Sequence, residues 1–125
     1  MLFTADQIIA HFIGDYVLQT NWMSSNKTKR WFPAIVHAIV YTLPFLLITQ
    51  NIFALLIICS THAVEDHYYL VKHFIRWKNG HKKEDVNPNT GYLKALPDWL
   101  TYWLLYAQDN ILHIVINAFA IKLLG

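Results

Sequence analysis

Four long stretches of apolar residues divide the chain, and short polar segments separate them. The apolar positions recur at helical spacing, which predicts four helices over residues of about 3–22, 34–50, 52–76 and 98–124. The stretches approach the roughly 17–25 residues that a membrane-spanning helix needs. The second is apolar on all sides except at His37, whereas a helix of a soluble bundle needs a polar face. The pattern predicts an all-α fold, in which one domain over residues 1–125 is a polytopic membrane bundle of four transmembrane helices.

The composition agrees with a membrane protein. Hydrophobic residues make up 55% of the chain and charged residues only 14%, whereas soluble domains carry about 25% charged residues. The single cysteine, Cys59, excludes an internal disulfide. Residues 78–97 have no apolar periodicity and contain several glycines and prolines, so we expect an ordered loop that covers a site at the membrane surface.

Lysine and arginine residues are distributed unevenly between the linkers. Nine of the ten lie in or beside the first and third linkers, and only Lys122 lies near the opposite side. The positive-inside rule then places both basic linkers in the cytoplasm and both termini in the periplasm of a bacterial inner membrane. The expected partners are membrane lipids, with anionic headgroups at the cytoplasmic face. No nucleic-acid partner is expected, and the pattern leaves a homo-oligomer open.

Three pairs of acidic and histidine residues interrupt the apolar stretches at one spacing. They are His11 with Asp15, His62 with Asp66, and Asp109 with His113. Residues four apart share a helix face, so each pair directs a carboxylate and an imidazole to the same side. An Asp at the centre of a transmembrane helix costs about 2.5–3.5 kcal/mol on insertion scales. Three such residues therefore point to a functional use.

Imidazole and carboxylate groups together suit zinc, manganese, iron or nickel. A helix rises about 1.5 Å per residue, so the number of residues from the nearest basic linker gives the depth of a side chain in the membrane. By this measure the three pairs and His37 lie at similar depths. We therefore expect a divalent metal, zinc or manganese, as one or two ions. One tetrahedral zinc site needs four ligands, and the chain offers more candidates than that. The candidate metal ligands are His11, Asp15, His37, His62, Asp66, Asp109 and His113.

The same residues also have structural explanations. A His–Asp pair four residues apart can satisfy its own hydrogen bonds, and a single intramembrane histidine such as His37 often joins two helices. His67 points away from the Asp66 face and His73 nears the interface, so both are predicted to be structural. Glu65 lies one step off that face, and its role stays open.

The segment AHFIGDYVLQTNWMSSNK resembles the opening of a family of small bacterial and phage membrane proteins, the domain of unknown function 3307. The family pattern is H-x-x-x-D-x-x-L-Q-T, a nearby Lys, a His early in the second span, H-x-x-x-D and a late D-x-x-x-H. The matching residues here are His11, Asp15, Leu18, Gln19, Thr20, Lys27, His37, His62, Asp66, Asp109 and His113. More distantly, the scattered His and Asp residues are similar to those of membrane-bound metal-dependent hydrolases. The family name implies no activity.

Three functions remain open. The leading hypothesis is an inner-membrane metal-dependent hydrolase acting on a phosphoester or lipid headgroup at the cytoplasmic leaflet. Its catalytic carboxylates would be Asp15, Asp66 and Asp109, and the anionic group would be bound by Gln19 and Lys27. The alternative is a divalent-cation or proton transport pathway along the same buried groups. The third is a non-enzymatic membrane partner protein, whose polar groups only lock helix packing.

Overall fold

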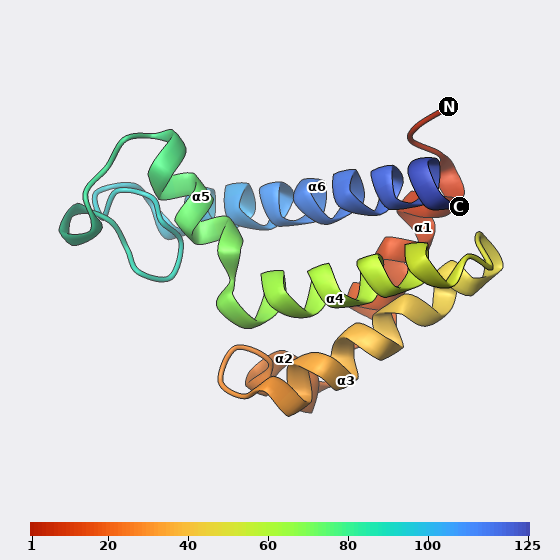
Figure 1. Ribbon diagram of the computed structural model, residues 1–125. Helices are drawn as coiled ribbons and strands as arrows, with labels where there is room; N and C mark the ends of the chain where they lie inside the picture. The colour runs from red at the N-terminus through yellow and green to blue at the C-terminus, as the bar shows by residue number, and fades with distance from the viewer.

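The computed structural model describes all 125 residues and is built from helices, so the all-α prediction is confirmed. The six α-helices are α1 (Ala5–Phe12), α2 (Asn21–Asn26), α3 (Trp31–Thr42), α4 (Ile52–Tyr68), α5 (Leu70–Lys78) and α6 (Asp98–Leu124). The other helical segments are the π-helix η1 (Ile13–Val17) and the 3-10 helices η2 (Leu43–Leu47) and η3 (Lys83–Asp85). Helix α4 packs between α3 and α6, and α5 with the following loop forms one end of the molecule (Figure 1).

The predicted bundle of four transmembrane helices is wrong. Only α6, with 27 residues and a mean hydropathy of 1.3, is long and apolar enough to cross a membrane. The range 98–124 is one continuous helix, but each of the other three predicted ranges is broken. Helices α1 and α3 have 8 and 12 residues, which at 1.5 Å per residue span about 12 and 18 Å. The hydrocarbon core of a bilayer is about 30 Å thick.

Local sequence features explain the breaks in the first two ranges. The π-helix closes where the Leu18 N–H donates to the Ile13 carbonyl, at 2.9 Å. The chain then leaves the helix, and the Thr20 hydroxyl begins α2 by accepting a hydrogen bond from the Met23 N–H. In the second range Pro44 has no N–H to continue the α-helical ladder, so α3 ends at Thr42 and tightens into η2.

The third range breaks at a single residue. Asn51 begins α4 by accepting hydrogen bonds from the N–H groups of Phe53 and Ala54. Tyr69 then has a φ of 51°, in the left-handed region that non-glycine residues seldom adopt. Helix α4 therefore ends, and α5 starts in a new direction (Figure 1).

The interior is unusually polar. One apolar cluster joins α1, α3, η2, α4 and α6 through residues that include Tyr41, Phe45 and Ile58, and a smaller one joins α5 to α6. Yet 11 of the 30 buried residues carry polar or charged side chains. Buried polar groups are costly unless they are paired, so this part of the interior needs a separate explanation.

The loop between α5 and α6 is ordered by its own hydrogen bonds. Val86 pairs with Leu93 in an antiparallel bridge, and the Asn87 N–H donates to the Tyr92 carbonyl at 2.8 Å. The Tyr92 hydroxyl accepts a hydrogen bond from Gln108 on α6, at 2.6 Å. The last of these contacts holds the loop against α6.

Candidate metal centre

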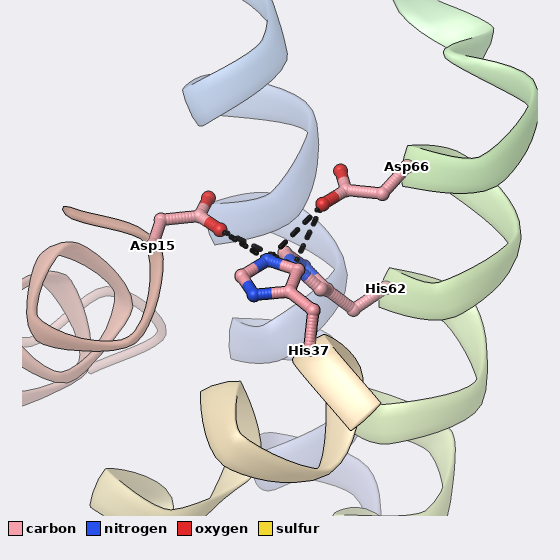
Figure 2. A group of neighbouring side chains, drawn as sticks. All are labelled: Asp15, His37, His62 and Asp66. Carbon is pink, nitrogen blue, oxygen red and sulfur yellow. Dashed lines mark hydrogen bonds and ion pairs between the residues drawn. The ribbon is translucent and has the colours of Figure 1, made fainter. Parts of the chain in front are cut away.

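Four buried side chains from three segments meet in the interior and form the first ligand set. Asp15 comes from η1, His37 from α3, and His62 and Asp66 from one face of α4 (Figure 2). One ligand atom from each lies within 4.8 Å of every other. The four-residue spacing on α4 accounts for the last two, because side chains at i and i+4 lie one above the other.

The distances within the first set suit a metal ion. Nε2 of His37 lies 3.1 Å from Asp15 Oδ1 and 3.2 Å from Asp66 Oδ2. Nε2 of His62 lies 3.2 and 3.1 Å from the same two oxygens. Tetrahedral ligands at 2.0–2.1 Å from an ion are about 3.3 Å from one another. Two imidazole nitrogens and two carboxylate oxygens are thus arranged with nearly the spacing of a zinc shell.

A second ligand set adjoins the first and shares Asp66 with it. Nε2 of His113 lies 3.2 Å from Asp66 Oδ1 and 3.4 Å from Asp109 Oδ1. This nitrogen is buried and has no hydrogen-bond partner in the protein. The first set uses Oδ2 of Asp66 and the second uses Oδ1, so one carboxylate faces both positions.

Glu65 stands behind the imidazole of the second set. Its Oε2 lies 2.7 Å from Nδ1 of His113, on the opposite side of the ring from the Asp66 contact. The pair does not have the direction of a good hydrogen bond, so the contact is electrostatic. The hydrogen bond of His113 Nδ1 goes to His62 Nδ1, at 3.2 Å. A carboxylate that accepts the other ring N–H of a metal-ligating histidine fixes the ring and raises its basicity, and Glu65 lies within reach of that role. The sequence pattern alone leaves this role of Glu65 open.

Carboxylates outnumber fixed positive charges at the centre. Four carboxylates, including Glu65, meet one ammonium group, that of Lys27, whose Nζ lies 2.8 Å from Asp66 Oδ2. Burial by itself raises the pKa of a carboxyl group, but the imidazoles of His37 and His62 outweigh it and hold the pKa of Asp15 below its usual range. The charge of His62 likewise keeps the pKa of Asp66 low despite burial. Asp15 and Asp66 are therefore ionised and can act as cation ligands.

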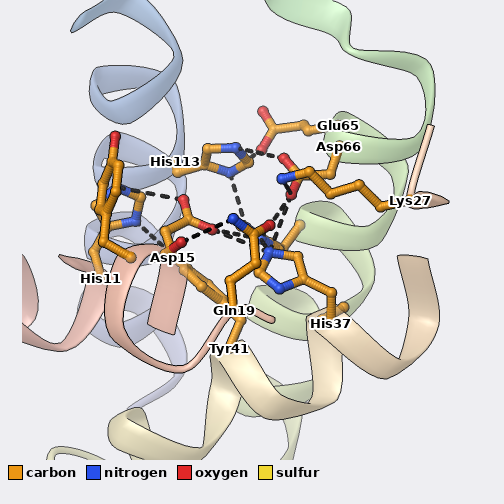
Figure 3. A network of polar contacts seen from close by, with 12 residues as sticks. His11, Asp15, Gln19, Lys27, His37, Tyr41, Glu65, Asp66 and His113 are labelled. Carbon is orange, nitrogen blue, oxygen red and sulfur yellow. Dashed lines mark hydrogen bonds and ion pairs between the residues drawn. The ribbon is translucent and has the colours of Figure 1, made fainter. Parts of the chain in front are cut away.

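His11 belongs to neither set. Its Nδ1 hydrogen bonds to the Tyr41 hydroxyl at 2.7 Å and its Nε2 to Asn110 Oδ1 at 2.9 Å, and Nε2 is 3.8 Å from Asp15 Oδ2. His11 and Tyr41 lie at the edge of the polar network around Asp15 (Figure 3). The Tyr41 ring stacks on that of His62, with centroids 3.6 Å apart, and so fixes its orientation. The structure thus places His11 and Tyr41 as neighbours that position the first set.

A close approach of two segments brings Asp15 into the centre. Gly14 lies against Tyr41, and a Cβ atom at this position would be 2.6 Å from the Tyr41 ring and 2.8 Å from its carbonyl oxygen. Asp15 is also part of the π-helix, a type of turn that is rare and often found at functional sites. The glycine and the π-turn together turn Asp15 toward α3 and α4.

One pocket of about 270 Å³ opens beside both ligand sets. Asp15 of the first set and Asp109 of the second line it, together with Gln19 and Lys27, the two predicted substrate-binding residues. Oε1 of Gln19 is buried without a hydrogen-bond partner, while its Nε2 donates to the Asp15 carbonyl at 3.1 Å. The loop over 78–97, which was predicted to cover the site, contributes no residue to the lining of this pocket.

The fold and this centre define an all-α protein with buried His and Asp groups that can hold a metal ion. The chain matches the family described as Protein of unknown function (DUF3307) over residues 2–124. It therefore belongs to that family, as its sequence pattern had indicated. No curated protein matches it, and no solved structure does. The more distant similarity to metal-dependent hydrolases stays a prediction.

Proposed function

We propose that this protein is a metal-dependent hydrolase that cleaves a phosphoester. The observation that carries the proposal is the single pocket onto which both ligand sets open, through Asp15 and Asp109. Ligand groups, a cationic side chain and space for a substrate thus lie together. A cluster that served only to hold helices together would need no such opening.

The ligand sets favour zinc or manganese, with room for two ions. The first set offers two imidazoles and two carboxylates, the number that tetrahedral zinc requires. The second offers three ligands and leaves positions open for water or substrate. Hydrolases with two ions hold them about 3.5–4 Å apart, and a carboxylate that presents one oxygen to each side, as Asp66 does, is a suitable bridge.

The side chains around the pocket supply the other roles. A bound divalent ion polarises a phosphoryl oxygen and makes water a better nucleophile near neutral pH. Asp109 is the least buried of the three acidic ligands, with 21% of its side chain exposed. Its Oδ1 would face the ion, and its other oxygen would act as the general base. It takes a proton from water as the water oxygen bonds to phosphorus, the ester P–O bond breaks, and the proton passes to the leaving oxygen.

Lys27 and Gln19 bind the anionic group of the substrate. Lys27 now neutralises Asp66, and Asp66 keeps the pKa of this lysine raised even though burial acts to lower it. With Asp66 bound to an ion, the ammonium group of Lys27 would be free to bind a phosphoryl oxygen in the pocket. The second pocket-lining group, the amide of Gln19, adds a polar contact.

We further propose that the enzyme works at the bacterial inner membrane, with lipids as its partners. Large apolar side chains remain exposed on α3, α4 and α6, among them Phe32 at 66%, Phe53 at 65% and Trp103 at 73%. Soluble monomers seldom expose apolar patches larger than a few hundred Å². A lipid headgroup phosphoester is then a substrate within reach of the site.

The test measures bound metal and phosphodiester hydrolysis on detergent-purified protein. We expect at least one zinc or manganese ion per chain, and hydrolysis of bis(p-nitrophenyl) phosphate that chelator abolishes and added metal restores. The Asp109→Asn variant should lose about 10²–10⁴-fold in kcat, because it removes the general base. The Lys27→Gln variant should mainly raise KM, since it removes a contact to the bound anion.

Lys29→Gln is the matched control for Lys27→Gln, because Lys29 is exposed and does not line the pocket. It should leave both constants unchanged. Protein that purifies without metal and does not respond to added ions would overturn the metal centre. Metal binding without hydrolysis, but with metal flux into liposomes, would replace the hydrolase by a cation pathway.

A further inference from the structure

A second pocket, of about 300 Å³, lies between α5 and the loop over residues 79–97. It shares no lining residue with the pocket beside the metal centre. Its volume is at the lower end of the range of about 300–1,000 Å³ found for ligand sites. It has no part in the function proposed above.

The lining of this pocket is basic. Lys72 and Arg76 lie one turn apart on the same face of α5, and Lys83 comes from η3 across the pocket. None of these three side chains forms an ion pair, and no carboxylate lines the pocket. The acidic residues next to Lys83 in the chain, Glu84 and Asp85, are not part of the lining. The pocket is therefore lined by three positive charges and by no carboxylate that would neutralise them.

The three positive charges all affect the pKa of one histidine in the same pocket. His73 also lines the pocket, and its pKa is lowered by burial first and then by the charges of Lys72, Arg76 and Lys83. Three cations from two segments therefore act on one point. Like charges held this close repel one another, and a bound anion would relieve the repulsion.

The pocket has a fixed shape because its loop is braced against α5. The Asn87 carbonyl accepts hydrogen bonds from the N–H groups of Thr90 and Gly91, at 3.2 and 2.9 Å. Gly91 has a φ of +79°, and a Cβ atom there would collide with the Lys72 carbonyl oxygen. Only glycine satisfies both the conformation and the contact. The loop backbone therefore touches the helix directly, and the pocket lies beside this contact.

We propose that this pocket binds a phosphate group, carried by a lipid headgroup or by a free phosphate ion, through Lys72, Arg76 and Lys83. The guanidinium group of Arg76 can bind two phosphate oxygens at once, and the two ammonium groups add point charges around the anion. The exposed aromatic side chains of Phe74 and Trp77 on the same helix would lie near the interface if the phosphate belongs to a lipid.

Two measurements on the full-length, detergent-purified protein test the site. The first titrates inorganic phosphate by calorimetry in the presence of chelator, so that phosphate cannot bind through ions at the His and Asp centre. The second measures flotation with vesicles of phosphatidylcholine, with and without anionic phosphatidylglycerol. Arg76→Gln and Lys83→Gln should each weaken phosphate binding about tenfold, the change expected from one lost charge-assisted hydrogen bond.

Lys82→Gln is the matched control, because Lys82 is exposed, adjacent to Lys83 and absent from the lining. It should leave phosphate binding within about twofold of the wild type. If Arg76→Gln also reduces the preference for anionic vesicles, the phosphate is that of a lipid headgroup. If it affects only the titration, the ligand is the free ion. Wild-type protein that binds no phosphate and floats equally with both vesicles would overturn the site, as would an equal effect of Lys82→Gln.

Discussion

At the scale of single residues, a buried carboxylate and its amide analogue differ in charge but hardly in size. This difference separates a metal centre from a packing cluster. An amide in place of a ligand weakens cation binding, whereas in a packing cluster it removes an expensive buried charge. Asp66 is a poor choice for this comparison, since its loss would leave the Lys27 ammonium group unpaired. Asp15 pairs only with imidazoles and is the cleaner position.

We predict that added zinc or manganese stabilises the wild type and that Asp15→Asn loses most of this gain. At a free-metal concentration one hundred times Kd, the gain is about 2.7 kcal/mol, which corresponds to a rise of several degrees in Tm. Thermal melts with and without chelator measure it for both proteins.

Asp85→Asn is the control, because Asp85 is exposed and lies outside both ligand sets. It should keep the full response to metal. A wild type that is indifferent to chelator, together with an Asp15→Asn variant that melts higher, would favour a packing role.

The sequence predicted the convergence of the polar residues better than their individual contacts. The spacing of four fixes which side chains share a helix face, so His62 with Asp66 and Asp109 with His113 could be paired from sequence. The same spacing paired His11 with Asp15, and their side chains do lie 3.8 Å apart, but the hydrogen bonds of His11 go to Tyr41 and Asn110. The role of Glu65 could not be predicted, because its support of His113 depends on how two helices pack, which the pattern of one helix does not contain.

At the scale of elements, η1 and α3 meet where Gly14 lies against Tyr41. We predict that Gly14→Ala costs about 1–3 kcal/mol of stability, the usual effect of overfilling a packed contact. It should also lower metal content, since Asp15 is the next residue and would move away from His37 and His62. Denaturant unfolding and elemental analysis of the purified variant measure the two effects.

The Gly80→Ala variant is the control that separates the loss of stability from the loss of metal. Gly80 has a φ of +68°, and no atom lies within 4 Å of the position that a Cβ would take, so its substitution strains the backbone without a collision. A cost of about 1–2 kcal/mol is expected, with metal content unchanged. Equal loss of metal in both variants would mean that the Gly14 contact does not position Asp15.

The elements also show why the helix count could not be predicted. Apolar periodicity continues through Leu18, Pro44 and Tyr69, where the helices actually break. Pro44 is a visible signal, but a proline is also compatible with a kinked, continuous helix. The π-turn before Leu18 and the left-handed Tyr69 leave no mark in the apolar pattern, because that pattern records which face is apolar and not the backbone conformation at one residue. Residues 98–124 contain no such break, and there the predicted bounds agree with α6.

At the scale of the whole molecule, the apolar outer surface bears on where the protein works. We predict that the expressed protein sediments with bacterial membranes and stays there after a high-salt wash, because apolar contacts are not screened by salt. Replacing Trp99 and Trp103, which are 71% and 73% exposed, with serine should increase the released fraction.

A peripheral membrane protein that binds lipid only through basic residues would be released by the same high-salt wash, and it serves as the comparison. Wild-type protein that is monodisperse in buffer without detergent would contradict a lipid-facing surface. The basic pocket at α5 would be unaffected by that outcome, since free phosphate could still bind there.

The two oxygens of Asp66 have a consequence for the order in which cations bind. Because Oδ2 faces one ligand set and Oδ1 the other, the two positions are thermodynamically linked through a single side chain. A cation held at one position would fix this carboxylate and compete with Lys27 for it, so a second cation would meet a preorganised oxygen but also a nearby positive charge. Occupancy of either position would change the cation affinity of the other by the same factor, because linkage between two binding sites is reciprocal. Cation concentration would then decide whether one or both positions are filled.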